Sequence, residues 1–179
     1  MRAQPAFRTF VMGLALGAIG VASMAIAIAR AQHSNVNSAA DRIQRLEDRA
    51  AIEELLVEYG RDLDHREFAA YAGLFATQGT WSGSIGTFTG PAAIQAAMEK
   101  AFKRQPGSVP AATFHLMTNF SVHVQGDRAT ASSKWTFFRM SNGAPVPTLA
   151  GMYDDTLVRE GGEWKFLRRV ASAAQAAAK

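Results

Sequence analysis

The feature that most constrains the fold is a change in hydrophobic period near residue 113. Before this point apolar residues recur at helical spacing, and after it they alternate with polar residues as in β-strands. The second part predicts four strands, over residues 113–125, 128–141, 148–160 and 163–171. Turns as short as Gly126-Asp127 and Gly161-Gly162 join antiparallel neighbours, so this half is predicted to be an antiparallel meander.

The N-terminal half predicts helices. The first begins at Asp41, a suitable N-cap, and its apolar residues continue to Leu63. Gly60 marks a position where this helix could loosen or end. The following elements are predicted as a short helix, a hairpin, a third helix and a loop, over residues 66–75, 80–89, 91–102 and 105–110.

Helices followed by antiparallel strands predict an α+β domain. We expect a cone-shaped α+β barrel, in which the N-terminal helices pack on one face of a curved antiparallel sheet. A ligand site would lie between the concave face of the sheet and the helices.

The first 31 residues have the pattern of an export signal. A basic lead precedes the uncharged apolar stretch 11–28, and Ala29-Arg30-Ala31 provides small residues for cleavage after Ala31. We predict a signal peptide over residues 1–31 and a polar linker over 32–40. The alternative is an uncleaved membrane anchor, because the apolar stretch approaches the ~20 residues that span a bilayer. The protein is therefore expected to be exported, either periplasmic or secreted, or anchored by this segment.

The composition and charge of the chain limit the classes of partner that we expect. The net charge is +4, but three of the 19 basic residues lie in the first 31 positions, which hold no acid. The remaining chain is nearly neutral and has no basic stripe, so nucleic acid is not an expected partner. The chain contains no cysteine, which excludes disulfides and cysteine-ligated metal. The histidines also lack the close spacing of metal ligands, so no metal site is predicted.

Four stretches resemble the SnoaL-like branch of the nuclear transport factor 2-like superfamily, which includes scytalone dehydratase and hexachlorocyclohexane dehydrochlorinase. They are DRAAIEELLVEYGRDLDHRE, TWSGSIGTFTGP, TFHLMTNFSVHVQGDRA and GMYDDTLVREGGEWKFLRR, beginning at residues 48, 80, 113 and 151. The resemblance runs from about Asp41 to Val170 and implies a domain over residues 41–171, followed by a flexible tail over 172–179. No single motif is specific, but their order and spacing together indicate the fold.

The resemblance also implies site residues. The family aspartate falls on Asp64 and the catalytic histidine on His115, while Trp81 falls on a pocket tryptophan of the dehydrochlorinase. Two departures separate the chain from scytalone dehydratase. That enzyme has an acid two residues after its helix tyrosine, where this chain has Arg61 after Tyr59, and the second catalytic histidine of that enzyme has no match here. The substrate of scytalone dehydratase is therefore not implied, and the matched pair does not imply a chlorinated substrate.

A carboxylate that accepts a proton from one imidazole nitrogen fixes the tautomer and makes the other nitrogen a better base. Such a pair can take a proton from carbon or relay one to a leaving hydroxyl. We therefore predict an Asp64–His115 dyad, with Tyr59 and Trp81 contacting the substrate. The chemistry of this family, elimination or isomerisation, needs no metal or organic cofactor.

Strict alternation raises a difficulty for this dyad. It places His115 on the mixed face of its strand, with Met117, and places Phe120, Val122 and Val124 on the opposite, apolar face. Either the mixed face lines the pocket, or a β-bulge near Thr118-Asn119 switches the parity.

The function we expect is that of an exported domain that binds a small, mostly apolar molecule and acts as a cofactor-independent lyase or isomerase. The alternative is a non-catalytic ligand-binding or dimerisation domain, in which Asp64 and His115 are structural residues. The fold commonly forms homo-oligomers, and Trp135 and Phe137, or Phe138 on the opposite parity, are candidates for such an interface. Asp155 and Arg169 could reach the cavity or pair across neighbouring strands.

Overall fold

A computed structural model describes residues 12–103 and 112–174, with side chains from residue 38 onward. The chain divides into two units, Met1–Arg45 and Leu46–Lys179. The first unit holds the beginning of helix α1 (Met12–His65), which continues through the predicted linker at residues 32–40. The predicted signal segment lies outside the residues whose side chains are described, as does the predicted loop at 105–110. Among the residues that are described, no helix combines the length and hydropathy needed to cross a membrane.

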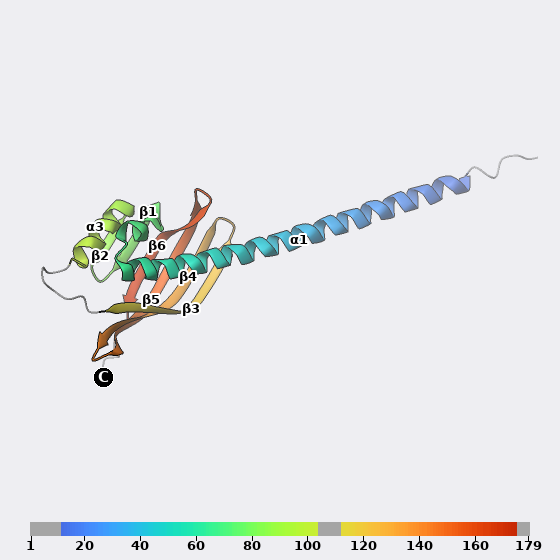
Figure 1. Ribbon diagram of the computed structural model, residues 1–179. Coiled ribbons are helices and arrows are strands. Elements are labelled where there is room, and N and C mark those ends of the chain that lie inside the picture. The colour runs from blue at the N-terminus through green and yellow to red at the C-terminus, as the bar shows by residue number, and fades with distance from the viewer. Residues whose placement is uncertain (1–11, 104–111, 175–179) are drawn as a thin grey trace, which may run out of the picture. The chain divides into compact units, whose positions relative to one another are not determined.

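The second unit contains three helical segments and one sheet. After α1 come α2 (Phe68–Gly73), β1 (Phe75–Gly83), β2 (Gly86–Thr89) and α3 (Pro91–Ala101). The long strands follow: β3 (Thr113–Gln125), β4 (Arg128–Ser141), β5 (Ala144–Glu160) and β6 (Glu163–Ala173). The predicted helices, hairpin and meander are all present, but several predicted boundaries were wrong. Helix α1 already includes Asp41, which is therefore not its N-cap. Strands β1 and β5 begin five and four residues earlier than predicted, and β6 extends two residues into the predicted tail. Figure 1 shows these elements along the chain.

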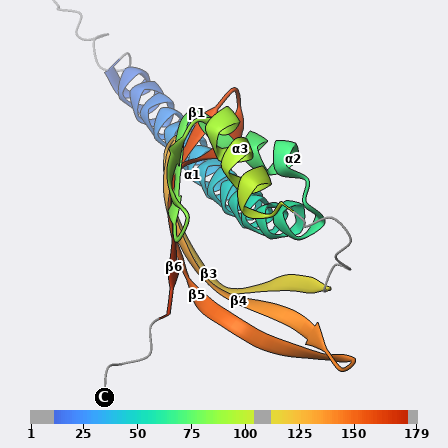
Figure 2. The ribbon, with the colours of Figure 1, turned by 90° about the vertical axis from the view of Figure 1, so that its left-hand side faces the viewer.

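The sheet is mixed and open. Its strand order is β2-β1-β6-β5-β4-β3, and every pair is antiparallel except β1 and β6, which run parallel. The expectation of a wholly antiparallel sheet was therefore wrong at this pair. No short turn connects β1 to β6, so nothing in the local sequence imposes their relative direction. Figure 2 shows the long strands bending around the side of the sheet on which α2 and α3 lie.

One face of α1 forms the helical side of the core. Ile52, Leu56 and Tyr59 are at most 1% exposed and belong to the same buried cluster as Leu157 and Phe166 of the sheet. Burying an aliphatic side chain of this size contributes about 1.5–3 kcal/mol. This burial fixes which side of α1 faces the sheet.

Gly60 does not end α1, contrary to the possibility that the sequence raised. A Cβ at this position would make ordinary contact with Sδ of Met117, at 3.4 Å, so Gly60 lies directly beside β3. The helix ends one turn later, where Arg66 has a φ of 65°. The N–H groups of Arg66 and Glu67 return to the carbonyls of Leu63 and Asp62, as in a Schellman motif.

Candidate functional site

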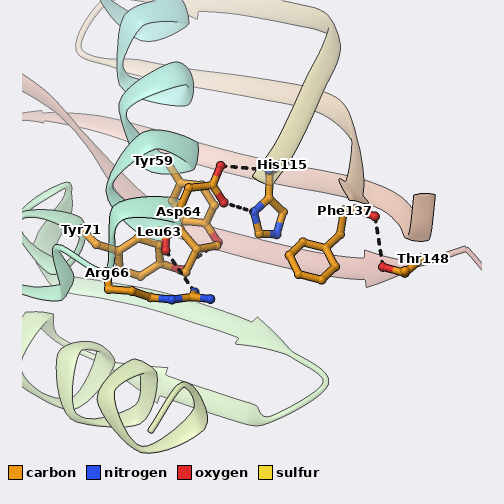
Figure 3. Close-up of polar contacts among 8 residues, drawn as sticks. All are labelled: Tyr59, Leu63, Asp64, Arg66, Tyr71, His115, Phe137 and Thr148. Carbon is orange, nitrogen blue, oxygen red and sulfur yellow. Dashed lines mark hydrogen bonds and ion pairs between the residues drawn. The ribbon is translucent and has the colours of Figure 1, made fainter. Parts of the chain in front are cut away.

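Asp64 and His115 form a close pair between the last turn of α1 and the beginning of β3. Oδ1 of Asp64 lies 2.6 Å from Nδ1 of His115, and Oδ2 accepts the backbone N–H of His115 at 2.9 Å (Figure 3). The side chains are 18% and 11% exposed, respectively. Both carboxylate oxygens are thus used to hold one histidine, and Nε2 is the ring nitrogen that remains for chemistry.

A bulge in β3 resolves the difficulty of parity. Asn119 has a φ of 57°, and the pairing of β3 with β4 shifts between Thr118 and Ser121. Before the bulge His115 and Met117 are the more buried residues, and after it Phe120 takes that position. The second of the two sequence-based alternatives is therefore confirmed. Asparagine suits this place, because it tolerates the left-handed region better than most residues.

Apolar side chains surround the dyad on the same face of the sheet. His115 is paired across the strands with Phe137, and Phe137 with Leu149. The rings of His115 and Phe137 lie 4.8 Å apart, the ring of Trp135 lies 6.4 Å from that of His115, and Leu149 is 57% exposed. The row beside His115 is therefore apolar, and part of it is open to solvent.

This placement changes the sequence-based assignment of Trp135 and Phe137. Both were candidates for an interface on the outer sheet face, but both contact the ring of His115. Phe138 is on the other face, where it stacks on Phe114 at 5.0 Å and 7°. The register of β4 and β5 shifts between Phe137 and Phe138, and Thr148 Oγ1 donates to the carbonyl of Phe137 at this point (Figure 3).

Tyr59 and Trp81 lie together in the core. The Tyr59 hydroxyl oxygen accepts hydrogen bonds from Trp81 Nε1 at 3.0 Å and from the Tyr71 hydroxyl at 2.8 Å. Tyr59 is 1% exposed and Trp81 7% exposed. Burial is the main cause that raises the pKa of Tyr71 well above its ordinary value. The structure thus connects the two predicted residues to each other, and their contact with a substrate stays a prediction.

A buried ion pair lies under this aromatic layer. Arg169 donates through Nε and Nη2 to both oxygens of Asp155, each at 2.8 Å, and both side chains are fully buried. The guanidinium carbon lies 3.8 Å from the centre of the Tyr59 ring and 4.2 Å from those of Tyr153 and Phe166. Burial opposes the charge, but Asp155 outweighs it and the pKa of Arg169 is raised. The predicted pairing across neighbouring strands is confirmed.

Two grooves cross strands β3, β4, β5 and β6. One, of about 450 Å³, is lined by residues such as Lys134, Thr136 and Met152, and another, of about 320 Å³, by Thr130, Ser132 and others. The first groove also includes Trp135 and the second Asp155. Neither groove is lined by the predicted site residues Asp64, His115, Tyr59 and Trp81. Within the described ranges, no three acidic or histidine side chains gather closely enough to hold a metal ion.

Comparisons with known proteins identify the family and the fold. A model of the SnoaL-like domain matches residues 44–170, whereas no curated protein matches the chain. An NTF2-like protein with a cystatin-like fold from Novosphingobium aromaticivorans is 27% identical, with a TM-score of 0.68 over 78% of this chain and 90% of that one.

Two further structures share the fold. A proposed scytalone dehydratase from the same organism is 25% identical, with a TM-score of 0.60 over 73% of this chain and 87% of that one. ActVI-ORFA from Streptomyces coelicolor is 22% identical, with a TM-score of 0.60 over 69% and 95%. Because the family model spans most of the sequence, the chain belongs to the SnoaL-like domain family and has the nuclear transport factor 2-like fold.

Proposed function

We propose that this protein is a cofactor-independent lyase or isomerase for a small, mostly apolar molecule, with His115 as general base. The observation that carries the proposal is the double contact of Asp64 with the ring and the backbone of His115. The contact to Nδ1 selects the tautomer in which Nε2 is unprotonated. The contact to the backbone N–H holds the part of β3 from which the ring projects. A base held in this way does not have to be reoriented for each turnover.

The chemistry that fits this dyad is proton transfer at carbon. In an elimination, Nε2 takes a proton from carbon, the C–H electron pair forms a double bond, and the proton then passes to the departing hydroxyl, which leaves as water. In an isomerisation, Nε2 returns the same proton to a different carbon. Asp64 stabilises the imidazolium between the two steps, because its negative charge lies at hydrogen-bond distance. General-base catalysis of this kind contributes about 10²–10⁴-fold in rate.

The substrate class is inferred from the residues beside the dyad. Phe137, Trp135 and the exposed Leu149 supply apolar contact area on the face that carries His115. A small hydroxylated carbonyl compound would place its apolar body against these residues and an acidic C–H near Nε2. The scytalone dehydratase assignment of one structural relative supports dehydration as the first reaction to test.

A panel of small hydroxylated and carbonyl compounds tests the proposal in D₂O. The wild type should exchange an acidic C–H for deuterium, or release water, with at least one compound, and His115→Ala should lose this activity. His123→Ala is the matched control, because His123 is exposed on the same strand beyond the bulge. Equal exchange by wild type and His115→Ala would overturn the proposal.

A non-catalytic ligand-binding domain is the second candidate. It is favoured by the deep burial of Tyr59 and Trp81, whose polar atoms form hydrogen bonds within the core. The same panel separates the two functions. A compound that shifts the NMR signals of Phe137 and Leu149, with no exchange or loss of water, would indicate binding alone.

We also propose that the protein acts outside the cytoplasm, through its N-terminal segment. The basic lead, the apolar stretch and the Ala29-Arg30-Ala31 site support export. N-terminal sequencing of the protein from cell fractions tests this directly. A mature chain beginning at Gln32 supports cleavage, while a membrane-bound chain beginning at Met1 supports the anchor.

A further inference from the structure

Helix α1 carries a second apolar stripe on the side turned away from the sheet. Leu46 is 67% exposed, Val57 is 50% exposed and Ala50 is also exposed. One turn before Leu46, Ile43 is 56% exposed. At 3.6 residues per turn Leu46, Ala50 and Val57 lie on the side of the helix away from the buried Ile52, so the sheet does not cover them.

The spacing of the stripe is that of a coiled coil. Ile43, Leu46, Ala50, Glu53 and Val57 follow one another at alternating steps of three and four residues, the a and d positions of a heptad. Glu53 is the polar exception, and its carboxylate accepts a hydrogen bond from Arg49 at 2.8 Å. A single polar core position lowers stability and specifies register.

The charges beside the stripe identify its partner. Arg42 and Arg49 occupy g positions, and Glu47 and Glu54 occupy e positions. In a parallel pair each g residue faces the e residue five positions later in the other helix, which matches arginine with glutamate both times. In an antiparallel pair g faces g and e faces e, so like charges would meet. We propose that a second copy of this chain docks along α1 as a short parallel coiled coil.

The proposed seam, the contact between the stripes of two copies, is short, and its length limits the stability of the dimer. It must end at Val57, because the next position of the repeat, Gly60, is buried and lies against Met117 of the same chain. Its few apolar layers, one of them alanine, predict a weak and concentration-dependent dimer. The seam uses residues outside the Asp64–His115 pair, so it does not depend on the proposed catalysis.

Cysteine cross-linking tests the seam, because the chain has no cysteine of its own. Ala50 and Ala51 are adjacent and both exposed, but only Ala50 lies on the stripe. A disulfide needs Cα atoms within about 7 Å, which an in-register parallel pair provides at Ala50 and not at Ala51. In the full chain under mild oxidation, Ala50→Cys should give at least about fivefold more disulfide dimer than Ala51→Cys.

Charge reversal then tests the orientation. On the Ala50→Cys background, Arg49→Glu should reduce the cross-linked fraction severalfold, and adding Glu54→Arg should restore it. Far-UV circular dichroism on each variant checks that the fold is retained. Equal cross-linking at the two alanines, no cross-linking at Ala50→Cys, or a fraction unchanged by Arg49→Glu would overturn the parallel seam.

Discussion

Asp64 binds His115 through both carboxylate oxygens, one to the ring nitrogen Nδ1 at 2.6 Å and one to the backbone N–H at 2.9 Å. The residues are 51 positions apart in the sequence, and they meet because α1 ends just where β3 begins to cross it. A negative charge in the last turn of a helix is unfavourable with respect to the helix dipole. The two hydrogen bonds from His115 compensate this cost, so the position of Asp64 is explained by what it holds.

Gly60 should tolerate a small side chain and reject a large one. An added Cβ would make ordinary contact with Sδ of Met117 at 3.4 Å, and alanine is favoured over glycine in a helix. Gly60→Ala should therefore raise the free energy of unfolding, by up to about 1 kcal/mol. Urea denaturation measures this change. A loss of stability with alanine would show that Met117 cannot yield.

Gly60→Leu should instead displace β3. The larger side chain must push Met117, and His115 lies two residues away on the same side of the strand. We expect the NMR signals of His115 to shift and the proposed activity to fall. An unchanged His115 environment in Gly60→Leu would mean that β3 is not held in place through this contact.

Removing one partner of the buried pair of Asp155 and Arg169 should lower stability strongly, whereas replacing both with apolar residues should lower it much less. Arg169→Met leaves a buried carboxylate without its partner, and we expect a loss of about 3–5 kcal/mol. The double variant Asp155→Leu/Arg169→Met removes both charges and should recover much of that loss. Glu163→Gln is the control, because it breaks an exposed pair with Lys165 and should change stability little. Equal instability of the single and double variants would contradict this account.

Asp62 should make stability depend on pH. Burial is the main cause that raises its pKa above the ordinary value, and the positive charge of Arg61 opposes this shift. Nε of Arg61 lies 3.6 Å from Oδ1, and Oδ1 has no hydrogen-bond partner among the described residues. A carboxyl group with a raised folded pKa favours the folded state while it is protonated, and this contribution is lost as pH rises through that pKa. Asp62→Asn should therefore gain stability relative to wild type as pH increases from acid to neutral.

Glu163→Gln should change the pH dependence of stability in the direction opposite to Asp62→Asn. The hydrogen bond from Lys165 lowers the pKa of Glu163, so the carboxylate favours folding above its unfolded pKa and this contribution is lost as pH falls. Glu163→Gln should therefore lose stability relative to wild type as pH increases from acid to neutral. The change should be smaller than for Asp62→Asn, because Glu163 is exposed. Denaturation midpoints across the acid range measure both variants. The same trend in both would show that local burial does not govern the effect.

Asn119 should be replaceable by glycine but not by valine. Its φ of 57° is left-handed, a conformation that glycine adopts freely and a β-branched residue does not. Asn119→Val should destabilise the fold or remove the bulge, which would turn His115 or Phe120 to the other face. Comparing the thermal midpoints of Asn119→Gly and Asn119→Val tests this, and equal values would contradict a strict requirement for positive φ.

The long helices and strands were predictable, because the spacing of apolar residues within each segment indicates its secondary structure. Short glycine turns defined the β3–β4 and β5–β6 hairpins, and the alternation of β3 even indicated a bulge near Asn119. The parallel pairing of β1 with β6 was not predictable, because no local turn fixes the direction of segments that are distant in the sequence. For the site, the resemblance selected Asp64 and His115, but their contact depends on the crossing of α1 and β3.

Other parts of the site needed the structure. Trp135 and Phe137 alternate like any half-buried strand residues, so their sequence could not distinguish the face of His115 from an outer interface. The sequence predicted that Tyr59 contacts the substrate, but only the folded core shows that Trp81 and Tyr71 both donate to its hydroxyl. Burial of a polar group depends on its neighbours in space, which periodicity does not specify.

The central claim is that Asp64 fixes the tautomer of His115, and ¹⁵N NMR of the histidine rings tests it most directly. At a pH of about 9, above the ordinary titration range of histidine, His115 of the wild type should carry its proton on Nδ1. In Asp64→Asn this preference should be lost, with His123 as the internal reference. A wild-type ring protonated on Nε2, or a tautomer that Asp64→Asn leaves unchanged, would contradict the account.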